Sequence, residues 1–523
     1  MRTVLLLLFI LPFAHCLNIL MYVNVVGKSH LQYAEKLVAI LNERGHSVDM
    51  VFGMSNSFVH LKGSYGAKKL IVVDFPGGSP WGAVTHLTDP FHEPSDWMRM
   101  ISKSNVKTFL NTNERLCELL LDSSEVADLL SSNRYDVALI SGYDLCPFAL
   151  AHRYQIAPVV SFVPSAAYYT QTYNAGLPEL PLYENVMFDE RFVDRSSFAT
   201  RLYDMIRTFK IRYDHYRHCE NMNEIVRAIF GDDFPDVQDI GLNISLDFSN
   251  SHPLLEEPRP ISQRIRYIGG VGLPTPKPLS KELDSMLNSA KKGNVIVSFG
   301  TQIDAEKFTE GMKRAFVNTF KRFPEYNFFW KFDGKTQMNA TNIINMDWLP
   351  QTDLLNDSRV VAFICHMGLN SFTETAFAGV PVVAIPIFTD QVHNARRAAA
   401  IGIGKIVRKS VISEDNLSSA LEKVLNDEKY RNRAKELSSM MNALPDTPKR
   451  IFTEGIEFAA KFQNLSSHYR LVGANHNFFV QIGWDVAAFF TVSCLLSAYL
   501  LTKLTLFVLS TIMFRMQEKT KRD

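Results

Sequence analysis

The sequence predicts an α/β protein made of two similar domains that face one another across a cleft, followed by one membrane-spanning helix. At 523 residues the chain is too long for a single ordinary core, so two domains of roughly 200 to 250 residues are expected. A connector rich in Pro and Gly, residues 269–280, separates them. Buried-strand runs and helical patterns occur on both sides of this connector, which favours an α/β class.

Composition narrows the class of partner. A hydrophobic content of 46% with 21% charged residues is that of a globular protein with some membrane segment. The net charge of +1 gives no electrostatic basis for binding nucleic acid, so that partner is set aside.

The N-terminus has the pattern of a secretory signal. Residues 1–16 combine Arg2 with an apolar run too short to span a bilayer, and small residues Ala14 and Cys16 precede a cleavage point. A luminal or secreted body is therefore expected. Five Asn-x-Ser/Thr acceptors for glycosylation agree with this expectation: Asn243, Asn339, Asn356, Asn416 and Asn464.

The C-terminus predicts a single-pass anchor. Residues 486–502 form an apolar run without charge, and Lys503 is expected to reach toward the cytosolic interface. Basic residues are concentrated in the tail, 503–523, so the tail should be cytosolic and the body luminal. The last five residues, K-T-K-R-D, resemble a dilysine retrieval signal of endoplasmic-reticulum membrane proteins, or form only a basic flank of the anchor.

Cysteine usage argues against a disulfide framework or a structural zinc site. Outside the signal and membrane segments only Cys117, Cys146, Cys219 and Cys365 remain, and no CxxC pair is present. A single bridge among them is left open.

The most informative stretch runs from Asp347 to Asn394. Val360 to Ile364 is an apolar run rich in β-branched residues, as expected of a strand buried on both faces. A helix capped by Asn370 or Ser371 should follow and end at Gly379, before a second strand, 382–385. This strand, turn, helix, strand unit predicts a parallel sheet.

Polar side chains gather where these two strands end. Ligands of parallel sheets bind outside the carboxyl ends of the strands, and a helix N-terminus there favours phosphate. A ribose diol suits a carboxylate acceptor, and a base suits an aromatic face with an amide beside it. The side chains in question are His366, Asn370, Ser371, Glu374, Asp390 and Gln391, with Trp348 and Gln351 in the preceding loop. Together they indicate a nucleotide-sugar site.

The order of these motifs resembles the donor signature of the UDP-glycosyltransferases, in particular the membrane-bound UDP-glucuronosyltransferase branch of animals. The matching blocks are W-L-P-Q, H-x-G-x-N-S-x-x-E, G-V-P and P-x-x-x-D-Q. The resemblance implies the glycosyltransferase-B fold, with an acceptor-binding domain at residues 17–268 and a UDP-sugar-binding domain at residues 281–480. The departures are Met367, where the family usually has Gly, and Cys365, where Ser or Thr is common; Met367 is expected to add bulk near the phosphates.

The resemblance also implies a role for each donor-site residue. Trp348 would stack on uracil and Gln351 would bond its edge, whereas Glu374 would hold the ribose. His366 with Ser371 would meet the diphosphate, and Asp390 with Gln391 would hold the sugar. Gly368 and Asn370 are expected in the same donor site. The S-F-G-T turn at the end of the strand 294–299 resembles the family's S-F-G-S/T element, which implies that Ser298 and Thr301 would touch phosphate or sugar.

His30 is the candidate base. It follows the first buried strand, 18–23, and a Ser29–Gln32 capping box is expected to place it in the first turn of a helix. The positive helix end keeps the imidazole neutral and able to accept a proton. A lone His at a helix start is more often structural, but in the family this turn carries the base, and the following L-x-x-R-G-H pattern matches. His46 in that pattern is interpreted as structural.

Asp144 is the candidate partner of His30. It follows the strand 136–141 and precedes Pro147, so taken alone it is a plain helix cap. The D-x-x-P segment resembles the one in which the family places the carboxylate that supports the base, as in hydrolase triads. We therefore predict a His30–Asp144 dyad.

The remaining candidate residues are interpreted mainly as structural. Aromatic residues of the first half are core or line an acceptor pocket: Trp81, Phe91, Trp97, Phe162, Tyr168, Tyr169 and Tyr173. His215, His218 and Cys219 have ligand-like spacing but are better explained as part of a solvated helix than as a metal site. No D-x-D metal motif is present, so neither a metal nor another cofactor is expected.

The implied activity is inverting transfer of glucuronic acid or glucose from a UDP-sugar to a hydroxyl of a small lipophilic acceptor. The choice between the two sugars stays open. A membrane-tethered binding protein of the same fold, without chemistry, is the alternative from another class, and a phosphorylase would require a cofactor lysine that the sequence does not reveal. The helix near residues 448–463 and the anchor leave homo- or hetero-oligomers possible.

Overall fold

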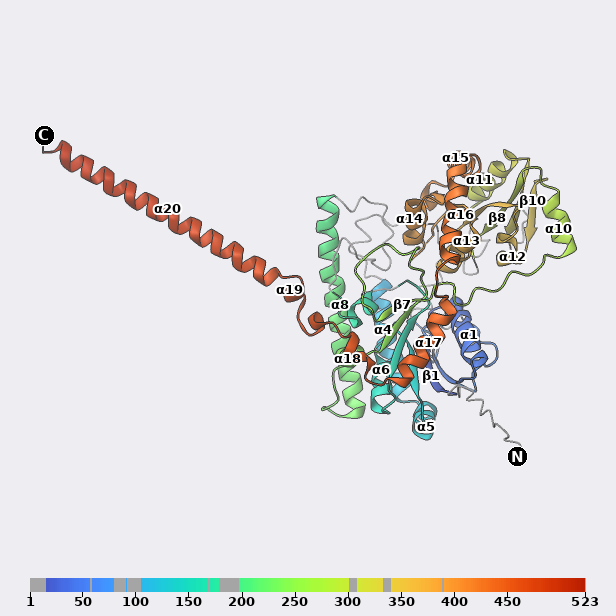
Figure 1. Ribbon diagram of the computed structural model, residues 1–523, viewed down its shortest axis with the longest axis horizontal. Helices are drawn as coiled ribbons and strands as arrows, with labels where there is room; N and C mark the ends of the chain where they lie inside the picture. Colours follow the sequence, from blue (N-terminus) through green and yellow to red (C-terminus); the bar gives the residue numbers. More distant parts are fainter. Residues whose placement is uncertain are drawn as a thin grey trace, which may run out of the picture.

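Two parallel β-sheets, one in each half of the chain, organise the protein in the computed structural model (Figure 1). It describes residues 16–56, 59–79, 91, 105–166, 169–177, 197–300, 308–332, 340–387 and 390–522. The signal segment, Trp81, Trp97, Tyr168, Thr301 and Asn339 lie outside the described residues. The predicted class, two Rossmann-like domains with a C-terminal apolar helix, is confirmed.

The first sheet has seven strands in the order β3-β2-β1-β4-β5-β6-β7. All neighbouring pairs are parallel. Its strands are β1 Asn18–Asn24, β2 Ser47–Gly53, β3 Lys69–Val73, β4 Val137–Ser141, β5 Val159–Val163, β6 Leu246–Ser249 and β7 Ile265–Tyr267. Both faces are covered, which explains the unbroken apolar runs of β1 and β4.

The second sheet repeats this topology with six strands in the order β10-β9-β8-β11-β12-β13. It is also parallel throughout. Its strands are β8 Gly293–Ser298, β9 Tyr326–Lys331, β10 Ile343–Met346, β11 Val360–Cys365, β12 Val382–Ala384 and β13 Gly404–Ile406. The predicted parallel pairing of the strands around residues 360–364 and 382–385 is correct.

Helices cover both faces of each sheet. Those of the first half are α1 Lys28–Glu43, α4 Asn105–Leu121, α5 Ser124–Ser132, α6 Cys146–Arg153, α7 Tyr169–Asn174, α8 Phe198–Phe230 and α9 Val237–Gly241. Those of the second half are α10 Lys281–Asn288, α11 Glu310–Lys321, α12 Gln351–Leu355, α13 Leu369–Ala378, α14 Gln391–Ile401, α15 Glu414–Asn426 and α16 Glu428–Asn442, with the 3₁₀ turn η2 Lys409–Val411.

The chain returns to the first sheet after α16. Helices α17 Pro448–Lys461 and α18 Leu465–Tyr469 contribute Phe452, Ile456 and Leu465 to the core of the first domain. The Phe452 and Phe248 rings lie 5.3 Å apart. The predicted carboxyl-terminal domain, residues 281–480, therefore includes helices that pack on the first domain, and this crossing connects the two domains. It also buries the apolar face of α17 within its own chain.

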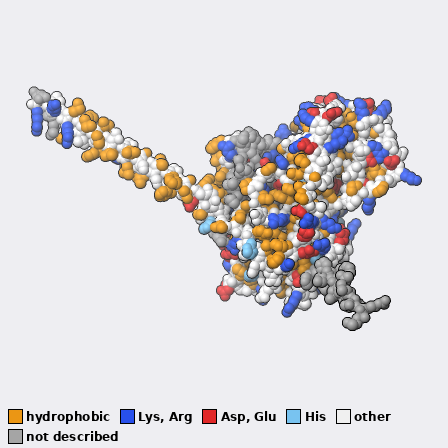
Figure 2. Space-filling view, in the orientation of Figure 1, with side chains coloured by type: hydrophobic (Ala, Val, Ile, Leu, Met, Phe, Trp, Pro, Cys, Tyr) orange, Lys and Arg blue, Asp and Glu red, His pale blue; other side chains and the backbone are white. Residues whose placement is uncertain are grey.

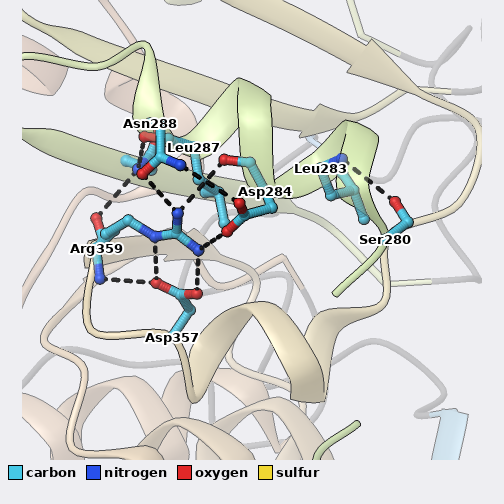
Figure 3. A network of polar contacts seen from close by, with 8 residues as sticks. Ser280, Leu283, Asp284, Leu287, Asn288, Asp357 and Arg359 are labelled. Atoms are coloured by element: carbon cyan, nitrogen blue, oxygen red, sulfur yellow. Dashed lines mark hydrogen bonds and ion pairs between the residues drawn. The ribbon is translucent and has the colours of Figure 1, made fainter. Parts of the chain in front are cut away.

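A disulfide in the first domain and the bonds of one arginine in the second domain hold helices in place. Cys117 of α4 and Cys146 of α6 form a disulfide, the single bridge that the sequence left open; Cys219 and Cys365 are buried and free. In the second domain Arg359, which precedes β11, donates to Asp357 (Nη2 to Oδ2, 2.6 Å) and pairs with Asp284 of α10 (2.8 Å; Figure 3). These bonds hold α10 against the start of β11.

The chain ends in one long apolar helix. After η3 Val472–Asn475 and α19 Phe478–Gln481, α20 spans Trp484–Thr520 and extends away from the body (Figure 1). Within it, residues 484–517 are long and apolar enough to cross a membrane, and Figure 2 shows hydrophobic side chains along the length of this helix. The helix is longer than the predicted segment 486–502, because Lys503 lies inside it rather than at its end.

Candidate active site

The predicted site residues lie at the topological switch point of each sheet. In the first sheet the strand order reverses between β1 and β4, and in the second between β8 and β11. Ligands of doubly wound sheets bind outside the carboxyl ends of the strands at such points. His30 and Asp144 follow β1 and β4, whereas Ser298 and His366 follow β8 and β11. The fold therefore provides two facing positions for a ligand.

One ring nitrogen of His30 forms a hydrogen bond within the protein. It lies in the first turn of α1, as predicted, but the helix begins at Lys28 with Gly27 as N-cap and has no side-chain cap, so the predicted capping box is wrong. Its Nδ1 is 3.3 Å from the carbonyl oxygen of Asn24. Because a carbonyl only accepts, Nδ1 carries the proton in this hydrogen bond, and Nε2 is left as the basic nitrogen. Burial lowers the pKa of His30 to about 4, so the ring is neutral near pH 7.

The Asn24 carbonyl is itself fixed by a buried network. Asn24 Nδ2 donates to Asn113 Oδ1 (3.1 Å), and Ser55 Oγ donates to Asn24 Oδ1 (2.6 Å). Asn113 Nδ2 in turn donates to the carbonyl of Tyr143 (3.2 Å). The Tyr143 ring stacks on the His30 imidazole, with centroids 5.4 Å apart and planes 14° apart. This network sets both the position and the plane of the imidazole.

Asp144 has different neighbours from those predicted. Among the described residues the structure records no hydrogen bond between Asp144 and His30; Asp144 Oδ1 accepts from Cys146 N at the start of α6 (3.2 Å). Its other oxygen, Oδ2, is buried and has no hydrogen-bond partner within the part of the chain that the structure describes. Burial raises the pKa of Asp144 to about 6, while His218 of α8 lowers it and Glu114 of α4 raises it. The carboxylate therefore lies toward α4 and α8 and caps α6.

His366 lies between Gly300 and Gly368 at the switch point of the second sheet. A β-carbon on Gly300 would lie 2.8 Å from the imidazole, and one on Gly368 would lie 2.7 Å from its Nε2. Burial lowers the pKa of His366 to about 4, whereas a hydrogen bond with the Ser298 backbone acts in the opposite direction. His366 Nδ1 is buried and has no hydrogen-bond partner among the described residues. A bound ligand is one explanation for an unpartnered buried polar atom in a native structure.

The helix start beside His366 offers free amides. Helix α13 begins at Leu369 with Gly368 as N-cap, so the predicted caps Asn370 and Ser371 instead occupy the first turn. The N–H groups of a first turn have no carbonyl partner within the helix, and the helix dipole favours negative charge there. The expected end at Gly379 is correct. This arrangement suits a diphosphate.

Three predicted residues meet on one side of this helix. Gln351 Nε2 donates to Glu374 Oε2 (2.7 Å) and lies 3.4 Å from Ser371 Oγ. Burial raises the pKa of Glu374, whereas the Gln351 hydrogen bond and the ammonium group of Lys36 lower it. Trp348, in the preceding loop, is 65% exposed, so its ring is open to a partner.

The remaining donor residues also follow strands of the second sheet. Asn394 Nδ2 donates to Asp390 Oδ2 (3.0 Å), and Gln391 Oε1 accepts from Ile387 N (2.9 Å). Ser298 Oγ lies 3.4 Å from Gly300 N, and Lys331 Nζ donates to the Gly300 carbonyl (2.8 Å). The turn after β8 is thus fixed by side chains that follow two neighbouring strands.

The two halves of the site meet between the domains. Burial raises the pKa of Tyr143; the Ser165 hydrogen bond lowers it, and Asp390 of the second domain raises it further. Asn250, which follows β6, lies with Nδ2 3.5 Å from Asn370 Oδ1. Arg397 of α14 donates from Nε to the carbonyl of Leu255 (3.0 Å). The loop after β4, which carries Tyr143, therefore lies near Asp390 of the second domain.

Comparison with known proteins agrees with this arrangement. Residues 20–521 match the family described as UDP-glucoronosyl and UDP-glucosyl transferase. The chain belongs to this family. It is 27% identical to UDP-glucosyltransferase 2 of Dactylopius coccus over 91% of this chain and 90% of that protein. It is 25% identical to UDP-glucuronosyltransferase 3A1 of Xenopus laevis, with 92% and 91% covered.

A solved structure supports the fold. The glycotransferase of kitacinnamycin superposes with a TM-score of 0.57 at 17% identity, covering 85% of this chain and 98% of that chain. The family and the fold together make this protein a UDP-glycosyltransferase, as predicted.

The departure of Met367 from the UDP-glycosyltransferase pattern has a structural explanation. Met367 has φ +62, a left-handed conformation that suits the glycine usual in the family. Its side chain is fully buried in the core with Cys365, whose Sγ lies 3.4 Å from Met367 Sδ. The expectation that Met367 adds bulk near the phosphates is therefore wrong, because the side chain points into the core.

Three residues at this UDP-glycosyltransferase site were missed by the sequence analysis. Asn24 and Tyr143 hold His30, and Lys36 of α1 lies near Glu374, with its side chain against Gly272 of the connector. Asn24 ends a buried strand, and a polar residue there was the available signal. Lys36 lies in the same helix as His30, but nothing local shows that it reaches the other domain.

The histidines and cysteine of α8 have ordinary partners. His218 Nδ1 lies 2.9 Å from Glu114 Oε1, and the His215 ring packs on Tyr173 with centroids 4.6 Å apart. Both histidines are buried, so the expected solvated face is wrong for them. Among the described residues no group of three His, Cys, Asp or Glu side chains is arranged to hold a metal ion.

Proposed function

We propose that this protein transfers glucose or glucuronic acid from a UDP-sugar to a hydroxyl of a small lipophilic acceptor, with inversion at the anomeric carbon. The observation that carries the proposal is the contact between the two domains at the site. Asn250 of the first domain lies 3.5 Å from Asn370 of the second, and the Asp390 charge acts on Tyr143, whose ring stacks on His30. The donor pattern, the family and the relatives named for glucosyl and glucuronosyl transfer support it.

In the proposed mechanism His30 is the general base. The hydrogen bond to Asn24 leaves Nε2 unprotonated, and a neutral ring with an accessible nitrogen takes the acceptor proton as the oxygen attacks C1. The attack comes from the face opposite UDP, so an α-linked donor yields a β-glycoside. The role of Asp144 as partner of the base stays a prediction, which Asp144→Asn tests below.

The leaving UDP is proposed to be held by the second domain. Trp348 and Gln351 receive uracil, and Glu374 receives the ribose. His366, the first turn of α13 and the turn of Ser298 and Thr301 receive the diphosphate, and Asp390 with Gln391 receives the sugar. Charge developing on the diphosphate is stabilised by helix amides and by His366, whose Nδ1 has no hydrogen-bond partner among the described residues, and no metal takes part in the proposed step.

We further propose that the protein is a single-pass membrane protein of the endoplasmic reticulum with a luminal body. The apolar helix α20, the basic tail and the signal-like N-terminus support this topology. The Cys117–Cys146 bridge fits an oxidising compartment. Four of the five acceptor asparagines are described, and all four are exposed: Asn243, Asn356, Asn416 and Asn464.

The test is an assay of the purified full chain with labelled UDP-glucose and UDP-glucuronic acid against a panel of phenols and lipophilic alcohols. We expect a β-glycoside from at least one donor, with anomeric configuration read by NMR. UDP binding without any glycoside would favour the membrane-tethered binding protein, and a chain that binds no UDP in calorimetry would contradict both functions.

A further inference from the structure

The first part of helix α8, residues 198–218, has the reverse of the side-chain arrangement that is normal in a soluble domain, whereas its last turns bury Cys219, Met222 and Val226 in the core. The face turned toward the protein carries polar side chains, including Asp204, Thr208, His215 and His218, all of which are buried. Large apolar side chains point instead to the outside. A helix of a soluble domain normally buries its apolar stripe and exposes its polar face.

The exposed apolar side chains form one stripe. They are separated by three or four residues, which places them on a single side of a helix. Phe198 is 72% exposed, Ile206 61% and Tyr213 63%. We define the α8 stripe as the exposed Phe198, Leu202, Ile206, Tyr213 and Tyr216 together with the half-buried Phe209. It runs along about five turns of the helix.

The α8 stripe is continuous with the apolar C-terminal helix. The Phe209 ring packs on Phe478 and Phe479 of α19 and on Trp484 of α20, with centroids 5.6, 6.2 and 6.3 Å apart. Figure 1 shows α19 against α8, with α20 running away from the body on that side. Phe479 and Trp484 are themselves exposed, so the apolar surface continues from α8 into the helix that is long enough to cross a membrane.

The charges along this part of α8 are mainly basic. Residues 197–217 include Asp204 and Asp214 as acidic side chains, and Asp204 is buried. The basic side chains are Arg201, Arg207, Lys210, Arg212 and Arg217. Basic residues beside an apolar helical face, with Tyr and Trp near the boundary, are the composition of helices that lie at a bilayer surface.

We propose that the α8 stripe lies in the interfacial layer of the same phospholipid bilayer that α20 crosses. The N-terminal domain is then held at the membrane by α8 as well as by α20, which fixes its orientation relative to the bilayer. Continuity with α20 favours lipid over a second protein, because lipid necessarily surrounds the first turns of α20 at the bilayer surface. This inference concerns a surface outside the transfer site and does not depend on which sugar is transferred.

The test uses the full chain in nanodiscs of phosphatidylcholine and phosphatidylserine. Cys494 is the exposed free cysteine outside the expected signal segment, so it is changed to Ser before a single spin label is introduced. The labelled variants are Ile206→Cys, on the α8 stripe, and Ile229→Cys, a matched exposed isoleucine near the end of the same helix and off the stripe. Collision rates with oxygen, which concentrates in lipid, and with a water-soluble nickel chelate report the environment of each label.

We expect the oxygen-to-nickel ratio to be severalfold higher at residue 206 than at residue 229. In a Leu202→Glu/Tyr213→Glu background the label at residue 206 should become accessible to nickel while the melting temperature is unchanged. Equal nickel accessibility at the two labels would overturn the proposal. Dipolar broadening between labels at residue 206 would overturn it differently, by showing that a second copy of the chain covers the stripe. Neither result depends on glycoside formation, so the inference fails or holds separately from the transferase activity.

Discussion

Two histidines occupy the switch points of two sheets with the same strand order, yet their surroundings differ. His30 is bonded through Nδ1 to the Asn24 carbonyl and stacked on Tyr143, which leaves Nε2 for a substrate. His366 is pressed between Gly300 and Gly368, and its Nδ1 has no partner among the described residues. Burial lowers the pKa of each ring to about 4, so both are neutral near pH 7.

The comparison of His30 and His366 shows that the strand order determines where a residue lies, whereas its local contacts determine which reaction or ligand it can serve. A neutral imidazole with a fixed tautomer and an open basic nitrogen is arranged to accept a proton. A neutral imidazole that lies between two glycines, beside the free amides of a helix start, is arranged to contact an anion. The same side chain thus serves proposed base catalysis in one domain and proposed diphosphate binding in the other.

The largest effect is expected for the first histidine. His30→Ala should lower kcat/KM by about 10² to 10⁴, because base catalysis typically contributes that much. The Kd for UDP should change less than about twofold, since the donor residues lie in the other domain. Because burial lowers the pKa of His30 to about 4, the base is already unprotonated above that pH, and kcat/KM should fall only as the pH drops toward 4. Initial rates from pH 4 to 8 and calorimetry with UDP measure these quantities.

His60→Ala is the matched control, because His60 is an exposed histidine in a loop of the same domain. It should leave both kcat/KM and the Kd for UDP unchanged. A His30→Ala variant with normal turnover would remove His30 from the mechanism and end the comparison between the two rings.

A smaller effect is expected from crowding the second histidine. Gly368→Ala would place a β-carbon 2.7 Å from His366 Nε2, and φ at Gly368 is −56°, so the backbone itself accepts alanine. The displaced ring should raise the Kd for UDP by about tenfold, which corresponds to roughly 1.4 kcal/mol. Gly311→Ala is the control, because its nearest neighbour is 3.8 Å away. Equal UDP affinity in the two variants would show that the His366 ring does not contact the diphosphate.

The sequence predicted the donor half of the site better than the acceptor half. The second domain carries most of its site residues in one contiguous stretch, 347–394, so a strand, a helix start and the next strand could be read directly. Their predicted closeness is seen in the bonds of Gln351 with Glu374 and Ser371. Local sequence is informative when the site is built by local structure.

The surroundings of His30 come from distant parts of the chain. Asn24 ends β1, Asn113 lies in α4, and Ser55 and Tyr143 follow β2 and β4. These residues meet only in the folded domain. The crossing of α17 back to the first sheet has the same origin, since its apolar face predicts burial but not the surface that covers it. Helix starts were displaced because glycines at positions 27 and 368 cap α1 and α13 by backbone geometry alone.

A still smaller effect is expected at the predicted partner of the base. Asp144→Asn keeps an oxygen that can accept from Cys146 N, and no hydrogen bond to His30 is recorded for the described residues. We therefore expect kcat to fall by less than about tenfold, whereas the corresponding change in a hydrolase triad costs about 10⁴. Single-turnover rates with saturating donor measure it. A loss as large as that of His30→Ala would restore the dyad and show that Asp144 turns toward His30 in the reacting complex.

The smallest effect on donor binding is expected at the residue that departs from the family pattern. Met367→Gly removes a fully buried side chain, at a cost of about 2 to 5 kcal/mol, and relieves a left-handed backbone worth roughly 1 to 2 kcal/mol. The melting temperature should therefore fall while the Kd for UDP stays within about twofold of the parent value. Met367→Leu is the control, because it keeps a similar buried volume and the same backbone strain. If Met367→Gly instead tightened UDP binding and Met367→Leu did not, the side chain would have to reach the phosphates, and the packing of Met367 against Cys365 would not be its arrangement in the complex.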